Sequence, residues 1–88
     1  MISDEFRVLL IDDDEDEFVN IRDILGEILS TTYALTWKSS YEEGLQALRD
    51  GQFDVCLVDY RLGEKSGIEL LREVRRLNIE CPVIFLTG

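Results

Sequence analysis

The stretch Val8-Leu9-Leu10-Ile11-Asp12-Asp13 joins four consecutive apolar residues to two acidic ones. An unbroken apolar run rich in Val, Leu and Ile is typical of a strand that is covered on both faces of a parallel sheet. We therefore expect residues 6–11 to form a buried strand. Polar residues that directly follow such a strand lie at the rim of the sheet where α/β proteins place their functional groups.

The rest of the chain alternates between strand-like and helix-like patterns. Further strands are expected at residues 33–38, 53–58 and 82–86, and helices at residues 17–29, 41–50 and 67–77. This alternation predicts an α/β fold with a doubly wound parallel sheet. Apolar and polar residues alternate along 33–38, which indicates an edge strand.

Short motifs mark where the helices begin and end. Ser40 and Ser66 are each followed three residues later by glutamate, at Glu43 and Glu69, and this spacing predicts two capping boxes. Gly51 is expected to end the second helix in a left-handed conformation, and Asn78 to cap the third. Asp14 and the three acids after it are expected to form the cap and first turn of the first helix, where carboxylates complement the helix dipole.

Composition excludes several classes of function. The 88 residues carry a net charge of −10 and no histidine. The chain is long enough for one small domain, and its charge argues against contact with nucleic acids or anionic membranes. Without histidine, Ser-His-Asp and Cys-His catalysis are excluded, and zinc loses its commonest ligand. The acidic N-terminus and the absence of a long apolar run favour a cytoplasmic protein, in which Cys56 and Cys81 stay free thiols.

Three strand ends bring polar side chains to one rim of the predicted sheet. Asp12 and Asp13 follow the first strand, Asp59 the third, and Thr87 the fourth. Taken singly, each has an ordinary structural explanation as a turn former or a solvated acid. Together, clustered carboxylates repel one another unless a cation compensates, and oxygen ligands on adjacent loops suit Mg²⁺. Magnesium in turn usually serves phosphoryl chemistry.

These motifs, together with residues 54–62, Gly67 and residues 83–88, resemble the receiver domain of two-component response regulators. The resemblance implies a flavodoxin-like receiver fold over residues 1–88. It implies that Asp59 accepts a phosphoryl group from a sensor histidine kinase or phosphotransfer protein. Asp13 would bind Mg²⁺ directly, Asp12 would help through water, and the backbone carbonyl of Arg61 would be a further ligand. Thr87 would contact the phosphoryl group and report phosphorylation.

The chain departs from the family pattern at its C-terminal end. A receiver has five βα units, whereas this sequence stops after the fourth expected strand. The fourth helix, the fifth strand, the fifth helix and the family's phosphoryl-binding lysine are therefore expected to be missing. We expect the 88 residues to self-associate, to exchange elements with a second copy, or to be the ordered part of a longer chain.

Three other interpretations compete with the receiver. A phosphatase of the haloacid dehalogenase type would use Asp12, Asp14 and Thr87, but it leaves Asp59 without a role. An EF-hand would use Asp12, Asp14 and Asp16, but its glycine position holds Glu17 and a strand precedes the loop. A receiver-like module used for interaction or dimerisation, without phosphorylation, shares the fold and stays open at this point.

Overall fold

The computed structural model describes residues 5–29 and 32–86. Along the chain the principal elements are β1 (Phe6–Ile11), α1 (Glu15–Ile28), β2 (Tyr33–Lys38), α2 (Tyr41–Asp50), β3 (Val55–Asp59), α3 (Gly67–Arg76) and β6 (Val83–Leu86). A short antiparallel hairpin, β4 (Arg61–Leu62) and β5 (Lys65–Ser66), lies between β3 and α3. Within this part of the chain, no helix has the length and apolar character needed to cross a membrane.

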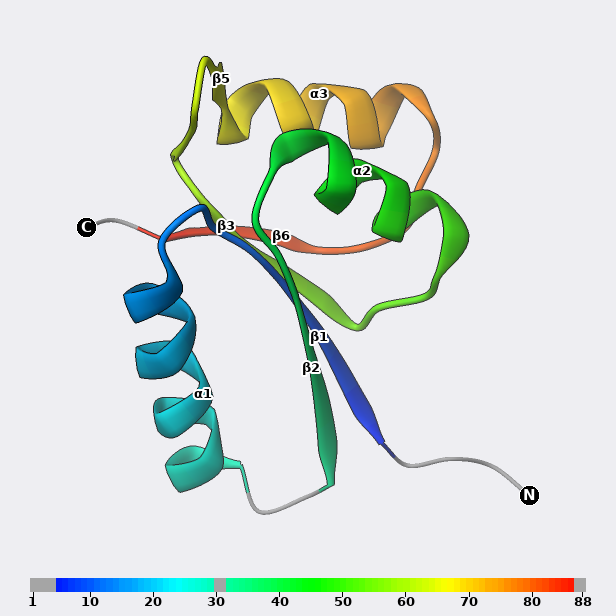
Figure 1. Cartoon of the computed structure of the whole chain (residues 1–88). Helices are drawn as coiled ribbons and strands as arrows, with labels where there is room; N and C mark the ends of the chain where they lie inside the picture. The colour runs from blue at the N-terminus through cyan, green and yellow to red at the C-terminus, as the bar shows by residue number, and fades with distance from the viewer. Residues whose placement is uncertain (1–4, 30–31, 87–88) are drawn as a thin grey trace.

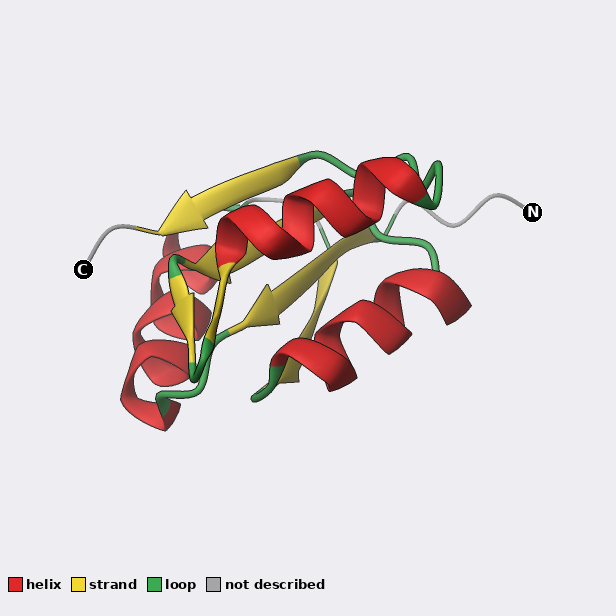
Figure 2. Ribbon diagram, turned by 90° about the horizontal axis from the view of Figure 1, so that it is seen from above, coloured by secondary structure: helices red, strands yellow, loops and turns green. Residues whose placement is uncertain are grey.

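The four long strands form one parallel sheet in the order β2-β1-β3-β6. Helix α1 lies on one face of the sheet, and α2 and α3 lie on the other (Figures 1 and 2). The predicted doubly wound α/β fold is therefore confirmed, with 33–38 as an edge strand. Because β1 and β3 are neighbours in the middle of the sheet, their C-terminal ends meet at the same rim.

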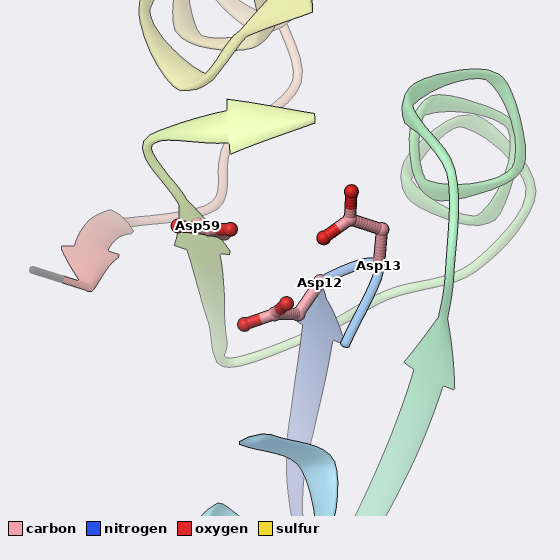
Figure 3. Close-up of side chains that lie close together, drawn as sticks. All are labelled: Asp12, Asp13 and Asp59. Carbon is pink, nitrogen blue, oxygen red and sulfur yellow. The ribbon is translucent and has the colours of Figure 1, made fainter. Parts of the chain in front are cut away.

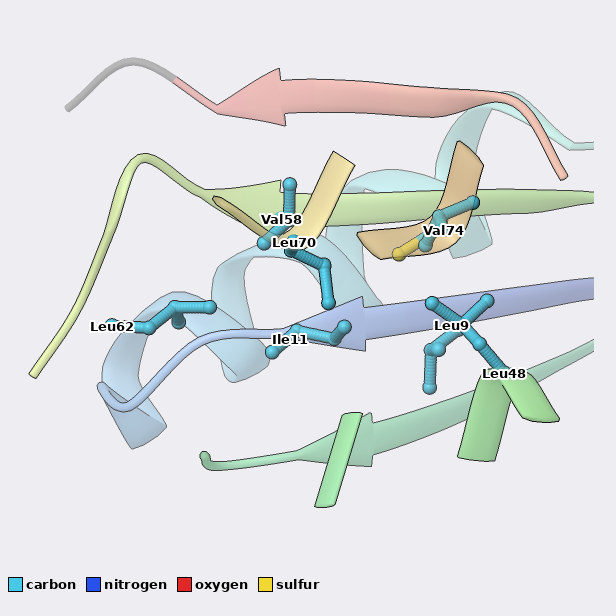
Figure 4. Packing of buried hydrophobic residues seen from close by; sticks show 8 residues of the cluster. Leu9, Ile11, Leu48, Val58, Leu62, Leu70 and Val74 are labelled. Atoms are coloured by element: carbon cyan, nitrogen blue, oxygen red, sulfur yellow. The ribbon is translucent and has the colours of Figure 1, made fainter. Parts of the chain in front are cut away.

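The main core lies between the sheet and the pair α2 and α3 (Figure 4). Leu9 and Ile11 of β1 point into it, and Leu70 and Val74 of α3 close it from the other side. All four side chains are buried. This packing holds β1 in place, and β1 leads to the rim of the sheet. It also holds the start of α3, which leads away from the rim.

The opposite face of the sheet is covered less completely. Val8 and Leu10 alternate with the core residues of β1 and are buried. Helix α1, however, has no buried residue, and Ile24, Ile28 and Ile84 are 49%, 67% and 51% exposed. Both α1 and the edge strand β6 therefore carry exposed apolar side chains.

The helix ends confirm some sequence predictions and correct others. Ser66 and Glu69 form a complete capping box, and Asn78 adopts the left-handed conformation just after α3 (φ 58°). At α2, the Ser40 hydroxyl accepts from the Glu43 N–H, and the Glu43 carboxylate accepts from that hydroxyl in return. Gly51 was predicted to be left-handed, but its backbone is extended (φ −117°), because α2 continues directly into an extended connection.

Several element boundaries also differ from the predicted ones, most by a single residue. Asp14 caps α1 as expected, so the helix begins at Glu15, two residues before the predicted start. The third strand occupies Val55–Asp59 rather than residues 53–58. The β4–β5 hairpin was not predicted, because its two-residue strands are too short to show a pattern; Gly63 turns it with φ 65°.

Candidate functional site

The three predicted acids meet at one point of the rim (Figure 3). Asp12 and Asp13 directly follow β1, and Asp59 is the last residue of β3. Val58 pairs with Ile11 in the parallel ladder, so the residues that follow each of them are brought together. One carboxylate oxygen from each acid lies within 4.8 Å of the other two.

Asp12 is the buried member of this cluster, with 2% of its surface exposed. Its backbone N–H donates to the Lys38 carbonyl (3.1 Å), and its Oδ1 accepts from the Asp14 N–H (2.9 Å). Burial raises the pKa of Asp12 from 3.8 to about 6; the Asp14 N–H opposes this rise, whereas the charges of Asp59, Glu17 and Asp13 add to it. The site therefore holds a carboxylate whose charge is costly without a cation.

Asp13 and Asp59 face open space rather than the core. Asp13 is exposed and Asp59 half-buried. Asp13 also lines a pocket of about 290 Å³ between the start of α2 and the β4–β5 hairpin. In its wall, the Lys65 ammonium lies 4.9 Å from the centre of the Tyr41 ring. A ligand can therefore approach the acidic cluster from the solvent side.

The cluster has dimensions that suit a small divalent cation. Two oxygens on opposite sides of a Mg²⁺ ion lie about 4.2 Å apart, because each bond is about 2.1 Å long. Neighbouring oxygens around the ion lie only about 3 Å apart. The three acids, whose oxygens lie within 4.8 Å of one another, would therefore draw closer together or bind the ion partly through water. Oxygen-only donors with open positions for water are the set that Mg²⁺ prefers.

Gly67 fixes the far side of the site. Its N–H donates to the Tyr60 carbonyl (2.7 Å), which ties the first residue of α3 to the end of β3. A Cβ atom here would lie 2.8 Å from a Phe85 ring carbon and 3.2 Å from the Asp59 carbonyl oxygen. Only glycine lets α3 begin so close to Asp59.

The contacts described above include neither of the other two predicted site residues, Arg61 and Thr87. Arg61 lies in β4, two residues beyond Asp59, with its side chain exposed. Its predicted role depends on its backbone carbonyl and stays a prediction. Thr87 lies outside the described residues.

The sequence reasoning did not identify Trp37 as part of the site. The Trp37 indole Nε1 donates to the Asp12 carbonyl (2.8 Å), and Trp37 is the last but one residue of the edge strand β2. Trp37 is the only tryptophan of the chain. Its place near the end of a strand that neighbours β1 is the one signal that could have pointed to it.

The sequence and structure of known proteins now identify this arrangement. The family model for the response regulator receiver domain matches residues 8–88. The chain belongs to the response regulator receiver domain family. It is thus a receiver module of two-component signalling, and the predicted identity is confirmed. The haloacid dehalogenase and EF-hand interpretations are wrong, and the interaction module without phosphorylation is not favoured.

Several full-length regulators contain a similar receiver. The transcriptional regulatory protein RprY of Bacteroides fragilis is 34% identical over 99% of this chain, which covers 36% of that protein. A protein-glutamate methylesterase/protein-glutamine glutaminase of Treponema denticola is 33% identical over 97% of this chain, which covers 23% of it. The chain spans about a third or less of the length of these relatives.

Solved receiver structures have the same fold. FixJ-N superposes with a TM-score of 0.81 at 29% identity, over 98% of this chain and 66% of that one. The receiver domain of the sensor histidine kinase PA1611 from Pseudomonas aeruginosa superposes with a TM-score of 0.81 at 24% identity, over 94% of this chain and 67% of that one. That structure holds a magnesium ion in its active-site cleft. The flavodoxin-like receiver fold is therefore shown, over about two thirds of these domains.

Proposed function

We propose that Asp59 is the phosphoacceptor of this receiver and that Asp12, Asp13 and Asp59 itself hold the Mg²⁺ ion that phosphorylation needs. The observation that carries the proposal is the convergence of the three acids on neighbouring strand ends, with their oxygens within 4.8 Å of one another. Asp59 is the half-buried member at the open side of the cluster. The Arg61 carbonyl completes the proposed ligand set, and Thr87 is the proposed phosphoryl contact and switch.

The chemistry is a transfer between two side chains. An Asp59 oxygen attacks the phosphorus of a phosphohistidine, so that an O–P bond forms while the N–P bond breaks and the imidazole leaves. Bound Mg²⁺ would neutralise charge on the phosphoryl oxygens. The receiver supplies position rather than an acid or a base. The proposed partner is therefore a sensor histidine kinase or a phosphotransfer protein, and the domain acts only on its own phosphorylation, not as an enzyme on other substrates.

Phosphorylation from a small donor tests this assignment. In a version extended to full receiver length, Asp59 should be phosphorylated by acetyl phosphate only when Mg²⁺ is present. Asp59→Asn should abolish the modification, whereas Asp50→Asn, an exposed acid at the end of α2, should leave it intact. Phosphate-affinity electrophoresis gives the extent, and mass spectrometry gives the position. A phosphoaspartate at any other residue contradicts the proposal.

We also propose that the chain by itself forms a homo-oligomer. The exposed apolar side chains of Ile24 and Ile28 on α1 and of Ile84 on β6 favour this, because a monomer rarely leaves large apolar surfaces in water. Phosphoryl transfer and self-association do not require contact with nucleic acid. The net charge of −10 disfavours such contact.

A further inference from the structure

Trp37 is attached to the acidic site through the backbone of Asp12. Its indole N–H donates to the Asp12 carbonyl (2.8 Å), while the Asp12 N–H donates to the carbonyl of the next residue, Lys38 (3.1 Å). Both polar backbone atoms of Asp12 are thus held by the last two residues of β2. The carbonyl belongs to the Asp12–Asp13 peptide plane, so the indole also sets the direction in which Asp13 leaves the sheet.

The indole takes a place that a strand backbone would otherwise fill. The β1–β2 ladder ends with the pair Ile11 and Lys38, and the chain then turns at Ser40 to begin α2. A half-buried carbonyl just beyond the ladder needs a donor. Trp37 reaches past the end of its own strand and supplies it.

The indole is itself held in position from the other side of the loop. The Phe18 ring of α1 stacks on it, with centroids 4.8 Å apart and planes within 10°. The Arg22 guanidinium lies 5.8 Å from the centre of the Phe18 ring. The loop between β1 and α1 contains Asp12 and Asp13. Trp37 binds the start of this loop at Asp12 and packs on Phe18 in the first turn of the helix that follows it.

We infer that Trp37 is a positioning residue for divalent cation binding: its indole N–H fixes the Asp12–Asp13 peptide so that both carboxylates face Asp59. This inference rests on the proposed function of the acidic site. Groups that hold the ligands of a metal, without touching it, commonly set its affinity. Here the need is strong, since three like charges must be kept together before the cation arrives.

Replacement of the donor alone tests the inference. Trp37→Phe keeps a ring to stack on Phe18 but removes the N–H. We expect the Mg²⁺ affinity of the chain to fall about 3- to 10-fold, the change in an equilibrium constant that one lost hydrogen bond produces. Phe53→Leu is the matched control, because it removes an aromatic ring beside Arg7, two residues before β3. It should lower stability and leave Mg²⁺ affinity unchanged.

The measurements separate positioning from general stability. Magnesium chloride alone is titrated, and amide NMR shifts at the acidic loops give the affinity, while urea unfolding in EDTA gives the stability of each variant. In the wild type, the Trp37 indole signal should shift during the titration. The inference is overturned if Trp37→Phe binds Mg²⁺ as tightly as the wild type. It is also overturned if Phe53→Leu, at the same stability as Trp37→Phe, loses as much Mg²⁺ affinity. A wild type that binds no Mg²⁺ instead overturns the proposed function, and this inference with it.

Discussion

Asp12 is a residue whose burial lowers the stability of the fold at neutral pH. Its carboxylate is buried, and the pKa is raised to about 6 in the folded chain, from 3.8. An acid whose pKa is raised by folding binds its proton more tightly in the folded state. Its favourable effect on stability is therefore present below pH 3.8 and is lost as the pH rises through about 6. At neutral pH without a cation, the charge of Asp12 destabilises the fold.

We predict that Asp12→Asn stabilises the metal-free chain at pH 7.5 by about 1–3 kcal/mol, because each unit of pKa shift corresponds to about 1.4 kcal/mol. The asparagine oxygen keeps the acceptor for the Asp14 N–H. Urea unfolding in EDTA measures the difference, which should shrink toward zero below about pH 4, where the aspartate is neutral too. A difference that persists unchanged at low pH would mean that the buried charge is not its cause.

At the scale of single elements, two glycines on helices should respond in opposite directions to the same substitution. At Gly67, a Cβ would come within 2.8 Å of the Phe85 ring and 3.2 Å of the Asp59 carbonyl, so α3 and the end of β3 must separate. At Gly26 in α1, the nearest atom would be the Tyr33 hydroxyl oxygen at 3.6 Å, an ordinary contact.

We therefore expect Gly67→Ala to lower the free energy of unfolding by about 1–3 kcal/mol, as overpacking does. Gly26→Ala should raise it by about 0.5–1 kcal/mol, because alanine is the better helix former. Chemical denaturation of both variants compares them under one condition. A Gly67→Ala variant as stable as the wild type would contradict the close contact between α3 and Asp59 in the structure.

For the whole molecule, the uneven covering of the sheet has a consequence. Helices α2 and α3 bury one face, while α1 leaves Ile24, Ile28 and Ile84 exposed, and β6 is an edge strand of the described sheet. Unpaired edges and apolar patches promote association. Burial of about 400 Å² of apolar surface is worth of order 10 kcal/mol at ~25 cal/mol per Å². This is comparable with the stability of a small domain, about 5–15 kcal/mol.

We predict that the 88 residues associate at micromolar concentration and that Ile84→Lys weakens this association. Light scattering at several concentrations gives the mass, and hydrogen exchange shows whether the amides of Val83–Leu86 become protected as the concentration rises. Glu80→Lys, an exposed position before β6 with the same new side chain, is the control for added positive charge. A wild type that stays monomeric and melts cooperatively contradicts the prediction.

The order of elements could be predicted from the sequence because its signals are local. Apolar runs, helical spacing and the Ser66–Glu69 capping box each depend on residues that are close along the chain. The rule that parallel strands share a functional rim also predicts, from the sequence alone, that Asp12, Asp13 and Asp59 lie together. The conformation of Gly51 was not predictable in this way, because the path of the chain after α2 overrides its preference for a left-handed turn.

Only the tertiary structure distinguished the members of the acidic cluster. Asp12 and Asp13 are adjacent acids in the sequence, yet one is buried and the other exposed, because the loop turns between them under the constraint of β2. The hydrogen bond from Trp37 to Asp12 likewise joins residues 25 positions apart. Such contacts depend on which strands become neighbours and on how side chains pack across them. The acidic residues of this receiver's site can therefore be predicted from its sequence. Their burial, the pKa of Asp12 and the residues that hold them in place follow from the tertiary packing.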